Sequence, residues 1–210
     1  MDVMESIVAR EAFSVFGVSV TNSVVSTWVM MAMVFVAVIV LRKRAPILIE
    51  MLVDFVDDLA GMFISGPTAP YVPFLGALLV FIATANLIGI VPMMYTPTRD
   101  LNTPLALSLV LLFVVFAFGI YAKGLPGFLK SFFQPMLPLD LIGYFSRTMS
   151  LSLRLFGNVI GNEIVVAVLF SLVPIGVPLI MVALGTITGI LQAYVFTVLA
   201  SSYIGSMVES

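Results

Sequence analysis

The chain has 210 residues, of which 61% are hydrophobic and only 10% are charged, and its mean hydropathy is +1.22. Soluble domains carry about 25% charged residues, so this composition excludes an ordinary soluble domain and indicates a helical membrane protein. The net charge of −2 offers no basic surface to nucleic acid, and the absence of cysteine and histidine excludes disulfides, thiol catalysis and histidine-bound metals. We therefore predict an all-α polytopic membrane protein that forms a single membrane domain over residues 1–210.

The first apolar run covers residues 23–41 and is long enough to cross the hydrocarbon core. The lead before it, residues 1–20, is mixed in composition and acidic at its start, so we expect no cleaved signal peptide. The run ends at the cationic cluster Arg42-Lys43-Arg44. The positive-inside rule places this cluster in the cytoplasm and the N-terminus outside.

A different kind of helix is predicted over residues 47–65, opened by Pro46. One of its faces is apolar and the other carries four carboxylates, so we expect it to lie on the cytoplasmic membrane surface. The four acidic residues are Glu50, Asp54, Asp57 and Asp58. A solvated acidic face is favoured here over a specific docking surface.

Two shorter spanning helices follow, over residues 71–94 and 105–122. Asn86 interrupts the first of them and is expected either to line a water path or to bridge two helices. The polar loop between them carries Arg99 and Asp100, whose charges cancel. The resulting topology puts Arg42, Lys43, Arg44, Lys123 and Lys130 inside, against Arg10 and Arg99 outside.

The last third of the chain predicts two very long helices, over residues 139–173 and 178–207, joined by a compact turn. The first would extend for roughly 50 Å, well beyond the thickness of a bilayer, so both helices must tilt. They are expected to form a slanted hairpin. No internal repeat is evident, which counts against an inverted-repeat transporter.

Arg154 lies deep in the first long helix, where a charged side chain costs several kcal/mol and is rarely present without a function. Ser150, Asn158 and Arg147 share its face by helical spacing. The alternative is that Arg154 reaches a membrane interface or pairs permanently with an acid. Arg147 lies nearer the cytoplasmic end and is expected to be an interfacial anchor.

Glu163 is the only acid deep in an apolar run, and Asn162 precedes it. It lies on the other side of the helix from Arg154 and roughly 13 Å further along the axis. Since burial disfavours the charged form of a carboxyl group, Glu163 is a candidate for proton exchange. A structural hydrogen bond to a neighbouring helix is the alternative.

On the last helix Gln192 is the one strongly polar side chain and is a candidate to face Arg154. Gly185, Gly189 and Ala193 repeat every four residues, which favours close helix packing. The sequence contains no phosphate-binding loop and no nucleophile with its base. It therefore favours ion passage over catalysis, and no cofactor is expected apart from the translocated ion.

The run Ser-Leu-Arg-Leu-Phe-Gly-Asn at 152–158, followed by Gly-Asn-Glu at 161–163, closely resembles subunit a of F-type ATP synthases. Supporting matches are Leu-Gln-Ala-Tyr at 191–194, Asn-Leu-Ile-Gly-Ile-Val-Pro at 86–92 and Asp-Leu-Asn at 100–102. The resemblance implies that Arg154 is the family's stator arginine, which faces carboxylates of the rotating c-ring. It also implies that polar residues line two ion half-channels, namely Asn158, Glu163 and Gln192, and with less support Asn86, Asn162, Ser150 and Gly185.

The resemblance further implies a subunit that is not an enzyme on its own and that translocates H⁺ or Na⁺. Its partners would be the c-ring, the peripheral-stalk b subunits, other ATP synthase subunits and the lipid bilayer of the cell membrane, with the C-terminus cytoplasmic. Some family members carry an ionisable residue at the position of Gly185, paired with the position of Glu163. The glycine here would leave a relay to Glu163 and water.

Two other functions compete with this one. A stand-alone ion-coupled secondary transporter would use Arg154 and Glu163 to bind an anionic substrate and a proton. A purely structural membrane subunit would use the same two residues as fixed contacts between helices, and would tolerate replacement of Arg154.

Overall fold

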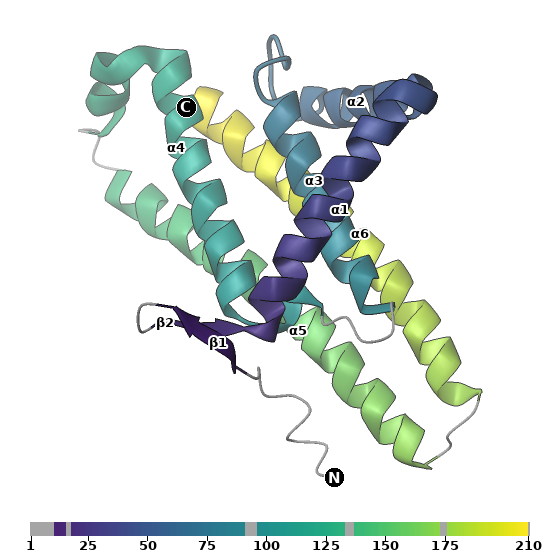
Figure 1. Ribbon diagram of the computed structural model, residues 1–210. Coiled ribbons are helices and arrows are strands. Elements are labelled where there is room, and N and C mark those ends of the chain that lie inside the picture. The colour runs from purple at the N-terminus through teal and green to yellow at the C-terminus, as the bar shows by residue number, and fades with distance from the viewer. Residues whose placement is uncertain (1–10, 16–17, 91–95, 133–136, 173–175, 210) are drawn as a thin grey trace.

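The computed structural model describes residues 11–15, 18–90, 96–132, 137–172 and 176–209 (Figure 1). In these ranges the chain forms six α-helices, two 3₁₀ turns and one pair of short strands. The elements are β1 (Glu11–Val15), β2 (Val18–Thr21), α1 (Asn22–Arg44), α2 (Pro46–Gly61), α3 (Val72–Leu87), η1 (Ile88–Ile90), η2 (Pro97–Arg99), α4 (Asn102–Phe132), α5 (Leu137–Leu172) and α6 (Val177–Glu209).

Four helices are long and apolar enough to cross a membrane, and the shorter apolar helix α3 packs among them. The four candidate spans are Val24–Arg44, Asn102–Gly124, Ile142–Leu172 and Val177–Glu209. The prediction of a polytopic, helical membrane protein is therefore confirmed. The antiparallel pair β1–β2, which lies just before α1, was not predicted.

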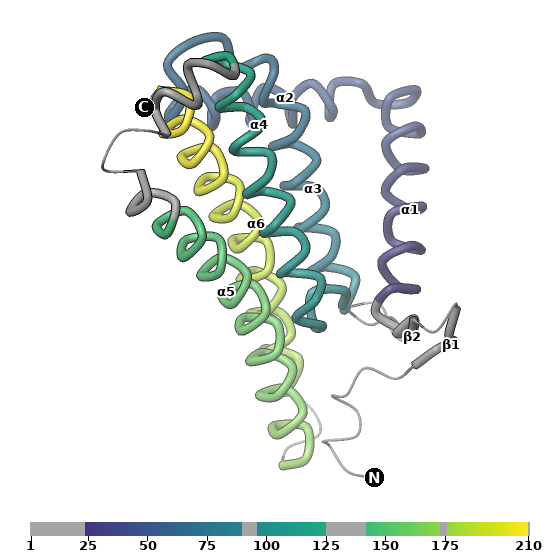
Figure 2. The backbone as a smooth tube through the Cα atoms, turned by 90° about the vertical axis from the view of Figure 1, so that its left-hand side faces the viewer, coloured from purple at the N-terminus to yellow at the C-terminus, as the bar shows by residue number. Residues whose placement is uncertain are grey.

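Helix α1 packs against the end of α3 through the buried Met30, but its second half lies away from the other spanning helices, and α2 crosses from its end toward α3 (Figure 2). The last turn of α1 carries Arg42, Lys43 and Arg44, whose charges suit the negative end of the helix dipole. Pro46 then occupies the first turn of α2, where its missing N–H costs nothing. Most of the surface of α1 is exposed and apolar, and an apolar groove of about 870 Å³ lies between α1, α2 and α3. Such a surface suits contact with hydrocarbon.

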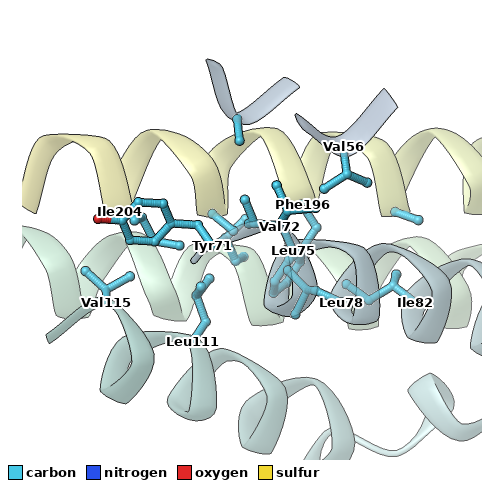
Figure 3. Close-up of a cluster of buried hydrophobic side chains, with 14 of the residues drawn as sticks. Val56, Tyr71, Val72, Leu75, Leu78, Ile82, Leu111, Val115, Phe196 and Ile204 are labelled. Atoms are coloured by element: carbon cyan, nitrogen blue, oxygen red, sulfur yellow. The ribbon is translucent and has the colours of Figure 1, made fainter. Parts of the chain in front are cut away.

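The core lies where α3, α4, α5 and α6 meet under α2 (Figure 3). Leu75 of α3, Leu111 of α4, Leu155 of α5 and Phe196 of α6 are fully buried there. At the end of α6, a Cβ on Gly205 would come within 2.1 Å of a backbone oxygen just after α2, so only glycine allows this close approach. The fold therefore fixes the end of α6 against the surface helix.

Helices α5 and α6 form the predicted hairpin, and with 36 and 33 residues they are the longest in the structure. At 1.5 Å per residue each spans about 50 Å, against roughly 30 Å of hydrocarbon. They run antiparallel, slant across the other helices and project beyond them at the end where they are joined (Figures 1 and 2).

Two helix ends differ from the sequence prediction. Helix α2 ends at Gly61, not at 65. Helix α3 ends at Leu87, and residues 91–94 of the predicted span lie outside the described residues. The spanning part of α4 ends at Gly124 (φ 72°), close to the predicted end at 122, because glycine adopts this non-helical angle easily. A second helical segment, which was not predicted, follows the bend and runs to Phe132.

Candidate functional site

Arg154 is exposed on α5, within the candidate span Ile142–Leu172. Its neighbours Leu151 and Leu155 are fully buried, so the adjoining face of α5 packs on the core while the arginine itself is exposed. Within the part of the chain that the structure describes, no carboxylate forms an ion pair with Arg154. The guanidinium is therefore not neutralised by any described side chain of its own subunit.

Arg147, two turns before Arg154, is held differently. Its guanidinium carbon lies 5.7 Å from the ring centroid of Tyr144 and 5.9 Å from that of Tyr203 on α6. Tyr144 in turn shares a hydrogen bond of 3.0 Å with Ser206. Cation–π contacts of this kind stabilise an arginine at an exposed site, as the interfacial anchor predicted from the sequence would require.

The register of the hairpin places Gln192 at the depth of Arg154. The Asn158 amide donates to the Thr188 carbonyl at 3.5 Å, and because the helices run antiparallel, four residues back on α5 corresponds to four residues forward on α6. Gln192 is only 8% exposed, and its Nε2 has no hydrogen-bond partner among the described residues. No described hydrogen bond joins it to Arg154. Ser150, one turn before Arg154, is exposed.

A second polar group forms where η2 meets α3, α5 and α6. The Thr98 hydroxyl donates to the Asn86 Oδ1 at 3.0 Å, and the Asn86 Nδ2 donates to the Gly189 carbonyl at 2.9 Å. The next residue, Arg99, places its Nε 3.2 Å from the Glu163 Oε2. We call the side chains of Asn86, Thr98, Arg99 and Glu163 the η2 cluster.

Two glycines of α6, Gly185 and Gly189, lie against amide side chains of neighbouring helices. A Cβ on Gly185 would lie 2.0 Å from the Asn162 Nδ2, and a Cβ on Gly189 would lie 3.0 Å from the Asn86 Cβ. The predicted close packing along this face of α6 is thus real, and its neighbours are amide side chains from α5 and α3. Asn162 fills the space that a side chain at position 185 would need.

The role of Arg99 was not predicted from the sequence. Arg99 and Asp100 were expected to cancel each other's charge in an outer loop, whereas Arg99 turns inward to Glu163. The carboxylate of Asp100 instead accepts a hydrogen bond from the backbone N–H of Asn102 at the start of α4, at 3.1 Å. The available signal was that a deep acid needs a partner, and Arg99 is one of only two cations on that predicted side.

The fold and these two sites define an integral membrane protein with polar and charged side chains at two levels of a long helical hairpin. The family model for the ATP synthase A chain matches residues 15–205. ATP synthase subunit a 2 of Bradyrhizobium sp. is 38% identical over 208 residues, covering 94% of this chain and 93% of that protein. ATP synthase subunit a of Moorella thermoacetica is 34% identical over 209 residues, covering 95% and 96%. ATP synthase subunit a 2 of Picosynechococcus sp. is 38% identical over 201 residues, covering 90% and 86%.

The chain belongs to the ATP synthase A chain family. It is therefore a membrane subunit of an ATP synthase complex, and the resemblance seen in the sequence is confirmed.

Proposed function

We propose that this subunit is the stator against which the c-ring turns, and that it forms two ion half-channels between which Arg154 prevents a short circuit. A ring carboxylate that reaches Arg154 is held in its charged form, because a nearby opposite charge favours ionisation. After it passes Arg154 it takes up an ion from the other half-channel and re-enters lipid neutral. Each elementary charge that crosses 100 mV supplies about 2.3 kcal/mol, which biases the rotation.

The observation that carries this proposal is the exposure of Arg154 on a membrane-spanning helix without an ion-pair partner among the described residues. A cation at membrane depth costs several kcal/mol unless an opposite charge or water compensates it. The structure therefore supports a carboxylate supplied by another subunit. A cation already paired within its own chain could not exchange partners in this way.

The η2 cluster supports one half-channel. The Arg99 and Glu163 side chains keep 13% and 32% of their surface exposed, Asn86 is hydrogen-bonded to Thr98 of the same cluster, and Asn162 precedes Glu163 on α5. This polar group lies two to three helical turns from Arg154, on the side of α5 toward the turn with α6. Gln192 and Asn158 lie near the level of Arg154 itself, where we propose that the unpartnered amide of Gln192 binds water or the passing ion.

The same proposal sets the orientation and the partners. The end of α1, helix α2 and the end of α6 lie on one side of the molecule, where the Ser65 N–H donates to Glu209 at 2.8 Å (Figure 1). The positive-inside rule makes that side cytoplasmic, because Arg42, Lys43 and Arg44 lie there. The N-terminus is then outside, the C-terminus is cytoplasmic, and the partners are the c-ring and the b subunits. The subunit itself catalyses no reaction and binds no cofactor; it translocates H⁺ or Na⁺.

The test is ATP-driven ion uptake into sealed vesicles that carry the assembled complex with Arg154→Ala. Uptake of protons is followed with a pH-sensitive dye and uptake of Na⁺ with a radioactive tracer. Coupled uptake of either ion should be lost while the subunit still co-purifies with the ring. Arg147→Ala is the matched control, because it removes an exposed arginine two turns away on the same helix, and it should retain most uptake.

Normal coupled uptake with Arg154→Ala would overturn the proposal and leave Arg154 as a structural residue. Ion transport by the purified subunit without a ring or an ATPase would instead support a stand-alone transporter.

A further inference from the structure

We propose that Arg99 is a positioning residue for Glu163, and that its guanidinium sets the affinity with which the half-channel on the η2 side binds the translocated ion. This inference rests on the proposed function. The charge partner comes from the turn before α4, since the last helix carries no Lys, Arg or His.

Arg99 and Glu163 form an ion pair. The Nε of Arg99 lies 3.2 Å from the Oε2 of Glu163, and the two side chains are only 13% and 32% exposed. Charges that are shielded from solvent in this way attract each other more strongly than surface charges and are less screened by salt. The guanidinium therefore acts on the Glu163 carboxylate as a resident cation.

Arg99 is held in place by the packing of the turn η2. Arg99 is the last residue of η2. The residue before it, Thr98, is completely buried, and its hydroxyl donates a hydrogen bond to Asn86 of α3. Asn86 also donates to the Gly189 carbonyl of α6. The turn is thus tied to two helices, and this directs the residue that follows Thr98 toward α5. The position of Arg99 follows from the packing of the turn, not from a freely moving loop.

On α6 there is no alternative cation for Glu163, because residues 177–209 contain no Lys, Arg or His. A Cβ on Gly185 would meet three side-chain atoms of Asn162 at 2.0 to 2.6 Å. A side chain at that position would therefore require the Asn162 amide to move. Among the described residues, Arg99 is the cation that Glu163 pairs with.

The ion pair should lower the affinity of Glu163 for the translocated ion. An ion that binds to Glu163 must compete with the Arg99 guanidinium for the carboxylate. Removing Arg99 should therefore tighten ion binding, whereas mere damage to the fold would weaken transport without tightening anything.

The experiment is ATP synthesis by the complex in sealed vesicles, driven by an imposed potential, with the H⁺ or Na⁺ concentration varied on the η2 side. Arg99→Gln should lower the half-saturating ion concentration about tenfold. Arg99→Lys keeps the charge but loses the guanidinium geometry, so its value should fall in between. Asp100→Asn is the matched control, because it changes one charge at the adjacent residue and should leave the half-saturating concentration unchanged.

Placing Arg99→Gln in a Glu163→Gln background separates a direct effect from an indirect one. The double variant should behave as Glu163→Gln does alone, because Arg99 acts through that carboxylate. A lower maximal rate with an unchanged half-saturating concentration would overturn the inference, and so would an equal effect of Arg99→Gln in both backgrounds. If Arg99→Gln does not assemble, Arg99→Lys decides: an unchanged half-saturating concentration overturns the inference.

Arg154→Ala in the same assay keeps the two proposals distinct. If that variant still couples normally, the stator function fails; if it does not, while Arg99→Gln leaves the half-saturating concentration unchanged, only the role of Arg99 fails.

Discussion

Arg154 and Arg99 are both arginines that meet the long hairpin, yet the structure treats them in opposite ways. Arg154 is exposed on α5 and has no ion-pair partner among the described residues. Arg99 is 13% exposed, lies in a turn packed against several helices and pairs with Glu163 at 3.2 Å. Among the described residues, Arg99 therefore has an ion-pair partner within the chain and Arg154 has none.

The difference shows which charge is compensated within the subunit and which requires a charge from outside it. A shielded arginine with its carboxylate in place needs nothing further from outside, and breaking such a pair is costly because it leaves an uncompensated charge. An exposed arginine on an apolar helix has the opposite requirement. It needs an opposite charge that arrives from elsewhere, and in the proposed mechanism that charge must also be able to leave.

The largest effect is expected from giving Arg154 an ion-pair partner within its own chain, as Arg99 has. Asn158→Asp places a carboxylate four residues from Arg154, on the same face of α5, where the two side chains can meet. The new acid should neutralise the arginine within its own helix, so ATP-driven ion uptake by the assembled complex should fall at least about tenfold.

Gly161→Asp is the control for Asn158→Asp. It adds the same charge at an exposed position of α5, where a new Cβ meets nothing within 4 Å. Equal losses of uptake in the two variants would mean that a carboxylate next to Arg154 has no special effect.

A smaller effect is expected from adding a partner for Glu163 on α6. Gly185→His would drive a side chain into Asn162, and overpacking of this kind costs about 1–3 kcal/mol. The melting temperature of the purified complex and the fraction of subunit that co-purifies with it should both fall. Adding Asn162→Ala should recover much of the loss, because it vacates the space.

Gly161→His serves as the comparison for Gly185→His, since its surroundings on α5 are open. A Gly185→His variant as stable as the natural chain would show that α6 does have room for a partner.

The smallest effect on stability is expected at Gln192. Its Nε2 is buried and has no hydrogen-bond partner in the part of the chain that the structure describes, so Gln192→Met, which is of similar size, should change the free energy of unfolding by less than about 1 kcal/mol. Ion uptake should nevertheless fall if the amide binds water or the ion beside Arg154. The measurement pairs a denaturation curve with the uptake assay, and unchanged uptake would remove Gln192 from the path.

Sequence patterns predicted most of the fold because they record local physics. The apolar runs gave the spanning helices, the acidic face gave α2, and the lack of proline over the last third gave the long hairpin. Gly124 shows both the strength and the limit of that approach: it ends the spanning helix, as a glycine between Lys123 and Pro126 suggests, but the helical segment that follows it to Phe132 was not predicted. The pair β1–β2 has no strong turn signal and was not predicted.

For the candidate site, the sequence identified the unusual residues but not their partners. Arg154, Glu163 and Asn86 are conspicuous because they are polar in apolar surroundings. Arg99 and Glu163 are 64 residues apart in the sequence. Their contact depends on a buried turn that no local pattern predicts. Long-range pairing of this kind follows from tertiary packing, which places η2 against α5.

The most direct test of the account is whether the surface around Arg154 meets the c-ring. The chain contains no cysteine, so a single introduced cysteine has no background. Gly157→Cys is well placed, because it is exposed, lies three residues from Arg154 and leaves a new Cβ without a clash. Val36→Cys is the control: it is equally accessible, but it lies on α1, which stands apart from α5 (Figure 2).

Each variant would be oxidised in assembled complexes whose ring carries a cysteine next to its ion-binding carboxylate. We predict that Gly157→Cys forms a disulfide with the ring and that this bond stops ATP-driven ion uptake until it is reduced, while Val36→Cys forms none. A ring disulfide from Val36→Cys but not from Gly157→Cys would contradict the claim that Arg154 faces the rotor.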